Sequence, residues 1–207
     1  MTERIETVAD TILYSGKFID VVSRTLRVVK SDSKPFEYSI EVARRPPGVR
    51  LIVLRDSRYL LLKEYRAELQ GWDYRLAGGK VFESQEHHLA FLQTSAPIAE
   101  RLAYTVSAEA KEELGIVVKA SHFMRKSSAG ATVDWDLYFF MIDGFEELES
   151  GPQPEGTELL TSEWHDADSV VHLIQSHQFS EDRSIGVLLQ EMLRRGDLLA
   201  SKPKSAA

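Results

Sequence analysis

The sequence contains no cysteine. Disulfide bonds, thiolate catalysis and cysteine-bound zinc are therefore excluded. Long hydrophobic runs are also lacking, because the two longest, Leu51–Leu54 and Tyr138–Ile142, are far too short to span a bilayer. The first ten residues have no apolar core of the kind found in signal peptides. We therefore expect a cytoplasmic protein that does not enter a membrane.

Positive charge is scarce as well. The chain has 25 Lys and Arg residues against 32 Asp and Glu residues, which gives a formal net charge of -7. A net negative field disfavours nucleic acid or an anionic membrane as the main partner. The motifs G-x-S-x-G, G-x-x-x-x-G-K-[ST], H-E-x-x-H and G-x-G-x-x-G are all absent. A small anionic substrate would therefore need local cations or a metal ion.

Apolar periodicity predicts strands along most of the chain and helices in its second half. The turn-like segment Ser31–Pro35 separates two N-terminal strands, and a second hairpin is predicted around the charged turn Arg55–Arg58. Residues 83–114 indicate a helix interrupted near Pro97, with Gly115 as its C-terminal cap. Its apolar stripe is formed by residues that recur every four positions, namely Leu102, Val106, Ala110 and Leu114. The predicted strands are 17–29, 37–43, 49–54, 59–62, 116–123 and 134–142, and the later helices are 167–175 and 185–195.

Three glutamates gather near the end of the long predicted helix. Glu109, Glu112 and Glu113 lie at i, i+3 and i+4, so their carboxylates share one side of the helix and repel each other. Glu113 projects into the apolar stripe, and a half-buried carboxylate needs a counter-charge. No basic residue of the same helix lies on that side, whereas a divalent cation takes oxygen ligands and would offset the repulsion. The alternative is a solvated acidic face, the commoner origin of such a charge run.

The segment Ala108–Ile116 resembles the second half of the Nudix box, whose pattern is R-E-U-x-E-E-x-G-U with U an apolar residue. Eight of the nine positions agree with this pattern or are free in it. Glu100 stands at the spacing at which the family places an earlier glutamate. The glycine that opens the box corresponds to Gly78-Gly79, so an insertion at about 80–99 separates it from Glu100.

Further segments resemble the branch of this superfamily that hydrolyses ADP-ribose and nucleotide sugars. In chain order they are Lys63–Arg66, Leu76–Gly78, Ser128–Gly130 followed by Asp134, and His177–Leu188. Two departures matter. Ala108 replaces the box arginine, which in the family helps to hold a catalytic glutamate, and Arg101 is the candidate substitute on the same helix. Leu76 and Ala129 replace the two prolines that mark the ADP-ribose branch.

The resemblance implies a site for Mg²⁺ or Mn²⁺. Glu109 and Glu113 would be metal ligands, and Glu112 would share or bridge the metal. A backbone carbonyl at Gly78 would complete the set. Such a metal would neutralise the charge on a pyrophosphate and activate the water that attacks it.

The resemblance also suggests residues for catalysis and for substrate binding. Asp134, together with Glu112, is the candidate catalytic residue, because the family often supplies the acid that orients the water from the loop after the box. Asp136 and Glu158 are its rivals. The candidate substrate-binding residues are Arg44, Arg45, Arg66 and Glu100. For the three arginines, salt bridges at the surface or in a dimer are the alternative.

Four aromatic and histidine side chains have two interpretations each. Trp72 and Tyr74 could stack on a base or a sugar, although large aromatic residues are more often part of the core. His87 and His88 lie in the insertion. Adjacent residues of a helix point apart, so we expect these two histidines to be a solvated pair rather than a metal site.

The fold implied by the resemblance is α/β, a Nudix-type α/β/α sandwich with a mixed sheet and an N-terminal β extension. We expect residues 1–45 to form this extension and to contact the second subunit of a homodimer. Residues 46–197 would form the Nudix hydrolase domain with its insertion, and residues 198–207 a disordered tail.

The implied activity is metal-dependent hydrolysis of the pyrophosphate bond of a nucleoside diphosphate derivative. A nucleotide sugar such as ADP-ribose is the first expectation, with a nucleoside monophosphate and a sugar phosphate as products. The alternative is a catalytically weakened Nudix domain that binds nucleotides as a regulatory module, which Ala108 and the insertion suggest. All three helix glutamates remain, and this favours catalysis.

Overall fold

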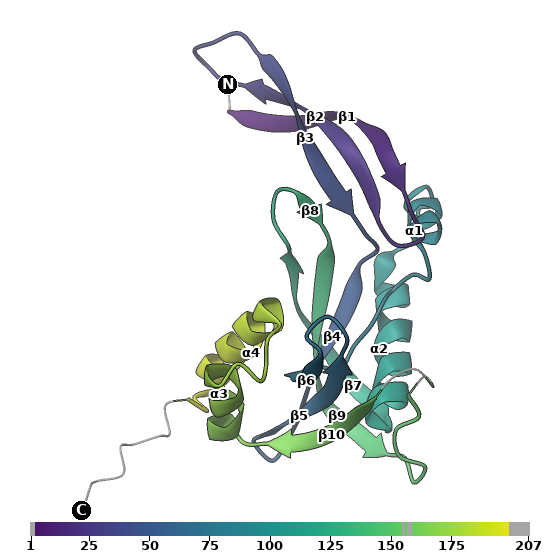
Figure 1. Ribbon diagram of the computed structural model, residues 1–207, viewed down its shortest axis with the longest axis vertical. Helices are drawn as coiled ribbons and strands as arrows, with labels where there is room; N and C mark the ends of the chain where they lie inside the picture. The colour runs from purple at the N-terminus through teal and green to yellow at the C-terminus, as the bar shows by residue number, and fades with distance from the viewer. Residues whose placement is uncertain (1–2, 155, 157–158, 199–207) are drawn as a thin grey trace, which may run out of the picture. The chain divides into compact units, whose positions relative to one another are not determined.

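The computed structural model describes residues 3–154, 156 and 159–198 (Figure 1). It divides into two compact units. Unit 1 comprises Met1–Gly48, Lys80–Pro97 and Ser128–Leu137, and unit 2 comprises Val49–Gly79, Ile98–Ser127 and Tyr138–Ala207. The predicted disordered tail lies outside the described residues from position 199 onward.

Unit 1 is built on a four-stranded sheet in the order β1-β2-β3-β8. Its strands are β1 (Arg4–Ser15), β2 (Asp20–Val29), β3 (Phe36–Arg44) and β8 (Val133–Asp134). The first three pair antiparallel, and β8 joins β3 in parallel. The predicted turn between β2 and β3 is confirmed. Strand β1 was not predicted, because its side chains are nearly all exposed and therefore carry no buried alternation.

The predicted insertion contains the short helix α1 (Gln85–Leu92). Ser84 caps it by accepting a hydrogen bond from the backbone N–H of His87 at 3.1 Å. The backbone N–H of Gln85 donates to the carbonyl of Lys17 at 2.8 Å, which ties the start of the helix to the loop between β1 and β2. The buried ring of Phe82 packs against Phe91 of the helix. The expected short helix within the insertion is therefore confirmed.

Unit 2 contains a six-stranded sheet with the order β10-β5-β4-β9-β7, in which β6 also pairs with β5. Its strands are β4 (Gly48–Arg55), β5 (Arg58–Arg66), β6 (Gly71–Arg75), β7 (Ile116–Ser128), β9 (Asp136–Glu147) and β10 (Leu160–His165). The predicted hairpin is confirmed, since β4 and β5 join through Asp56 and Ser57, which both have positive φ as a two-residue hairpin turn requires. Strand β10 was not predicted, because it is short and half polar.

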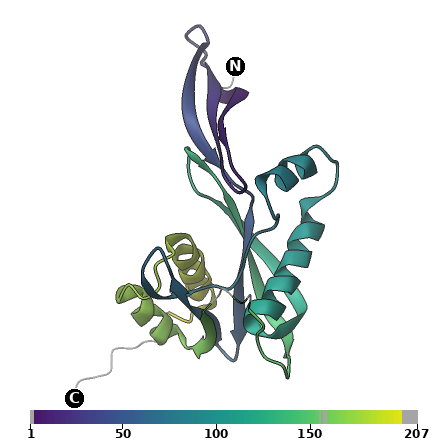
Figure 2. The same cartoon turned by 45° about the vertical axis from the view of Figure 1, so that its right-hand side comes forward.

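Three helices cover the sheet of unit 2: α2 (Ile98–Leu114) lies on one face, and α3 (Ala167–Gln175) and α4 (Asp182–Arg195) lie on the other (Figure 2). Helix α2 buries Leu102, Val106, Ala110 and Leu114, the predicted four-residue repeat, and ends at Gly115 with φ +64. The predicted mixed α/β architecture is confirmed. In the described ranges no helix is long and apolar enough to cross a membrane.

The two histidines of α1 differ, contrary to the expectation of a solvated pair. His87 is exposed, but His88 is half-buried and its ring lies 5.0 Å from that of Phe82. Burial lowers the pKa of His88, outweighing the nearby carboxylates of Asp134 and Asp136. This difference could not be predicted from the helix alone, because the aromatic partner of His88 precedes the helix.

Replacing His88 with Gln should make unit 1 less sensitive to acid. The folded-state pKa lies below the ordinary value of 6.5, so the unfolded chain takes up a proton first, and stability is lost as the pH falls through that value. We expect thermal unfolding midpoints between pH 7.5 and 5.5 to fall less steeply in His88→Gln than in the wild type. His87→Gln is the matched control. Parallel curves for all three proteins would contradict this interpretation of His88.

Candidate functional site

The site is built around the Gly78-Gly79 turn that follows β6. This turn runs alongside β4, where the backbone N–H of Val49 donates to the carbonyl of Gly79 at 2.9 Å. Gly78 has φ +139, and a Cβ at this position would lie 2.2 Å from the carbonyl oxygen of Val49. Only glycine fits there, because the conformation and the backbone contact both exclude a side chain.

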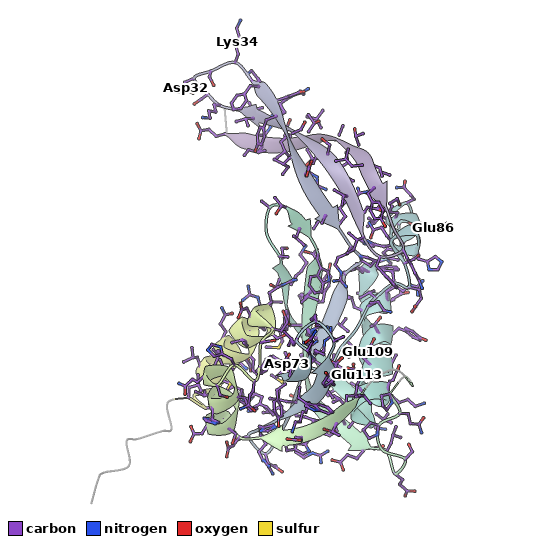
Figure 3. All side chains as sticks on the ribbon, viewed as in Figure 1. Asp32, Lys34, Asp73, Glu86, Glu109 and Glu113 are labelled. Atoms are coloured by element: carbon purple, nitrogen blue, oxygen red, sulfur yellow. The ribbon has the colours of Figure 1, made fainter. Side chains whose placement is uncertain are left out.

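Two of the three helix glutamates contact this turn. The backbone N–H of Gly78 donates to Glu113 Oε2 at 2.7 Å. A Cβ on Gly79 would lie 2.0 Å from Glu109 Oε1, so the carboxylate of Glu109 fills the space that the missing side chain leaves. Both glutamates are half-buried, and Figure 3 shows them on the side of α2 that faces the strands. The structure therefore brings together Gly78, Glu109 and Glu113, and their role as metal ligands stays a prediction.

A half-buried arginine from β4 supplies positive charge that acts electrostatically on these carboxylates. Arg50 Nη1 donates to the carbonyl oxygens of Val49 at 3.0 Å and of Gly78 at 3.2 Å. Burial lowers the pKa of Arg50, while the negative charges of Glu181, Glu113 and Glu109 act in the opposite direction. The half-buried glutamates therefore do have a counter-charge within the protein.

The segment before α4 is hydrogen-bonded to β6, and Glu181 of this segment lies near Arg50. Asp73 is almost fully buried, accepts a hydrogen bond from the backbone N–H of Ser180 at 2.9 Å and pairs with Arg75 at 2.9 Å. Glu181 Oε2 lies 3.7 Å from Arg50 Nε. Charged side chains of β4 and β6 and the residue before α4 therefore lie near one another within unit 2.

The donor set at the turn fits a hard cation. It consists of two carboxylates and backbone carbonyl groups, and oxygen is the ligand that Mg²⁺ prefers. Within the described residues, no three Asp, Glu or His side chains converge as a ready-made metal site. Mg²⁺ does not require three, because it commonly keeps several waters and binds through one or two carboxylates together with substrate phosphates.

The other predicted site residues of unit 2 make different contacts. Glu112 is half-buried, and its backbone carbonyl accepts a hydrogen bond from Gln153 at 2.8 Å. Glu100 is exposed in the first turn of α2, about 13 Å along the helix axis from Glu109 at 1.5 Å per residue. Arg66 donates to Glu64 and Glu68 at 2.7 Å each. The contact of Arg66 with a substrate phosphate stays a prediction.

The remaining candidates belong to unit 1. Asp134 accepts a hydrogen bond from Arg24 at 3.1 Å, and its rival Asp136 accepts one from Ser128 at 2.8 Å. Arg44 pairs with Asp10 at 3.2 Å and with Asp20 at 3.3 Å. The guanidinium of Arg45 lies 4.1 Å from the centre of the Trp135 ring. Glu158, the second rival, lies outside the described residues.

The two aromatic candidates differ in exposure. Trp72 is 52% exposed and meets Tyr65 edge to face at 5.7 Å. Tyr74 is buried, and its hydroxyl donates to Glu163 at 3.0 Å. Trp72 therefore has an open face for stacking, whereas Tyr74 is a core residue.

Sequence reasoning missed Arg50. Its signal was present, because Arg50 is the one charged residue within the apolar stretch Val49–Leu54. A charge inside a strand that is otherwise buried requires a partner. That partner could not be identified from one strand, since the glycine turn and the glutamates lie far away in the sequence.

Comparisons with known proteins bear on the fold and on the chemistry. No protein-family model matches the chain. A crystal structure of an ADP compounds hydrolase matches it with a TM-score of 0.58 at 18% identity, covering 95% of this chain and 96% of that one. The chain has a Nudix-type fold. The predicted resemblance and fold class are therefore confirmed.

A curated relative is similar in sequence as well. It is the CMP-5'-(N-acetyl-N-hydroxy-3-aminopropyl)phosphonate hydrolase of Streptomyces rubellomurinus, which is 28% identical over 150 residues. The match includes 70% of this chain and 64% of the relative, so the chain spans less than two thirds of that protein's length. The names of both similar proteins describe hydrolases of nucleotide compounds.

The two glycines should respond differently to alanine. In Gly79→Ala the new Cβ meets the end of a flexible side chain, so Glu109 can move away at little cost to the fold. In Gly78→Ala the Cβ meets the backbone of Val49 at an unfavourable φ, and the cost is about 1–3 kcal/mol or more. We expect the unfolding midpoint to drop in Gly78→Ala only, and divalent-metal affinity to drop in Gly79→Ala.

Gly186→Ala is the matched control, because a Cβ on this helix α4 residue would meet nothing within 4 Å. It should stabilise α4 slightly and leave metal binding unchanged. Equal effects of Gly78→Ala and Gly79→Ala on stability would show that the Glu109 carboxylate does not occupy the space beside Gly79.

Proposed function

We propose that this protein hydrolyses the pyrophosphate bond of a nucleoside diphosphate derivative with the help of Mg²⁺ or Mn²⁺. A nucleotide sugar such as ADP-ribose is the first substrate class to test. The single observation that carries the proposal is the contact of Glu109 and Glu113 with the Gly78-Gly79 turn. Two half-buried carboxylates held against a glycine turn differ from a solvated acidic face, because part of their hydration is replaced by the backbone of the turn.

The chemistry follows from these groups. Glu109 and Glu113 would hold the cation, with Glu112 of the same helix as the predicted sharing ligand. When bound, a divalent cation neutralises phosphate charge and lowers the pKa of a coordinated water. The water oxygen forms a bond to one phosphorus, the bond from that phosphorus to the bridging oxygen breaks, and a proton is lost to solvent. The products are two phosphate monoesters, and Asp134 stays the predicted acid that orients the water.

The names of the two similar proteins support a nucleotide moiety and leave the rest of the substrate open. One names ADP compounds and the other a CMP phosphonate conjugate. Both names contain a nucleotide, and they differ in the base and in the rest of the compound. The substrate panel should therefore vary the base and the distal group separately.

The test of this function is a panel of ADP-ribose, other nucleotide sugars and CMP conjugates incubated with Mg²⁺. Formation of a nucleoside monophosphate and a second phosphorus monoester is expected for at least one of them. Nucleotide binding without turnover across the panel would support the alternative, a weakened Nudix domain that acts as a binding module. Neither binding nor turnover would contradict both.

Glu112→Gln and Glu113→Gln should each abolish turnover while the fold stays intact. Neutralising one carboxylate relieves repulsion within the cluster when no metal is bound, so the unfolding midpoint in EDTA should be unchanged or higher. Glu146→Gln is the control, because Glu146 is exposed and pairs with Lys119 at the surface. Near-normal turnover in both helix variants would show that the metal-site assignment is wrong.

We further propose that the sheet of unit 1 contacts a second copy of the chain. Strand β1 exposes Ile5, Ile12 and Tyr14, each by more than half, and an apolar surface of this kind is typical of an interface. Size-exclusion chromatography with light scattering should show a dimer for the wild type and a monomer for Ile12→Asp. A monomeric wild type at micromolar concentration would contradict the proposal.

A further inference from the structure

We propose that Arg50 replaces the missing arginine of the Nudix box as a positioning residue. From β4 it fixes the Gly78-Gly79 turn and supplies the counter-charge for Glu109 and Glu113. This inference rests on the proposed function, because it assigns a role within the same site.

The hydrogen bonds of Arg50 join two segments. Its Nη1 reaches the carbonyl oxygen of Val49 on its own strand and that of Gly78 in the turn, at 3.0 and 3.2 Å. Gly78 in turn donates its N–H to Glu113 at 2.7 Å. A continuous series of hydrogen bonds therefore runs from the guanidinium through the turn to a predicted metal ligand.

The position of Arg50 also suits its charge. Its side chain is 14% exposed and lies 3.7 Å from Glu181, while Glu109 and Glu113 interact with it electrostatically. A planar guanidinium can direct several N–H groups to separate acceptors at once, whereas an ammonium is a point charge. The site therefore uses the shape of arginine as well as its charge.

The two candidate positions on α2 differ from Arg50 in charge or in place. Ala108 has no polar side chain, and Arg101, the substitute considered from the sequence, is exposed near the start of the helix. In the Nudix box pattern the arginine directly precedes the first glutamate, which corresponds to Glu109 here. Here β4 places a guanidinium against the turn that Glu113 contacts, where the charges of Glu109 and Glu113 act on it, and this would compensate for the loss at position 108.

The test compares Arg50→Lys with Arg55→Lys, a control on the same strand whose guanidinium pairs with exposed Glu147. Lysine keeps the charge, so the net electrostatic field on the metal is preserved. Mn²⁺ affinity is measured by electron paramagnetic resonance without substrate, and kcat and KM are measured on the substrate identified from the panel. For Arg50→Lys we expect about tenfold weaker Mn²⁺ binding and about tenfold lower kcat, with KM little changed. Changes of this size are typical when a residue that orients a metal ligand is replaced.

A second-site variant tests the replacement itself. Adding Ala108→Arg to Arg50→Lys should recover part of the lost Mn²⁺ affinity and kcat, whereas Ala108→Arg alone should improve neither. If Arg50→Lys only damaged the fold, Ala108→Arg would not restore Mn²⁺ affinity or kcat. Circular dichroism and unfolding midpoints establish that each variant is folded. No recovery in the double variant would show that the two arginine positions do not serve the same role.

The outcomes separate the two proposals. If the wild type binds no Mn²⁺ and hydrolyses nothing in the panel, the proposed function fails and this inference with it. If the wild type binds Mn²⁺ and turns over substrate, and Arg50→Lys matches it within twofold in both measurements, the role of Arg50 alone is overturned.

Discussion

The candidate site depends on one constraint, the close approach of the Gly78-Gly79 turn to the carboxylates of α2. Gly78 cannot carry a side chain because the backbone of Val49 occupies the space, and a side chain on Gly79 would displace the carboxylate of Glu109. The backbone N–H of Gly78 then binds Glu113. Because these two residues lack side chains, the helix with three glutamates can approach the turn closely.

The turn holds the negative charges of Glu109 and Glu113 in a half-buried position, where charge is unfavourable. Half-buried carboxylates four residues apart on one helix repel each other, and their desolvation adds to the cost. Arg50 offsets part of it, and Glu181 and the Asp73–Arg75 pair extend the network through β6 to the start of α4. Removing the guanidinium of Arg50 would leave the carboxylates without this compensation, whereas neutralising one carboxylate relieves repulsion. A chain that needed only a stable fold would be better served by apolar residues in these positions.

The sequence predicted the parts of the fold that have a simple period. The repeat from Leu102 to Leu114 located α2, and the apolar runs around Asp56 and Ser57 located the β4–β5 hairpin. Strand β1 escaped because its exposed face has no period to detect. The glutamates and the glycines could be predicted because they match the two halves of one motif pattern, although an insertion separates these halves here. Arg50 could not, because its partners come from a turn and a helix that only the folded chain brings beside β4.

The central claim is that the turn and the two glutamates hold a divalent cation. Anomalous diffraction from crystals of the full chain soaked in Mn²⁺ tests it most directly, because manganese can be located independently of any activity. The account predicts an anomalous peak within coordination distance of the Glu109 and Glu113 carboxylates. A fully occupied peak elsewhere in the molecule, or none at this turn at millimolar Mn²⁺, would contradict it.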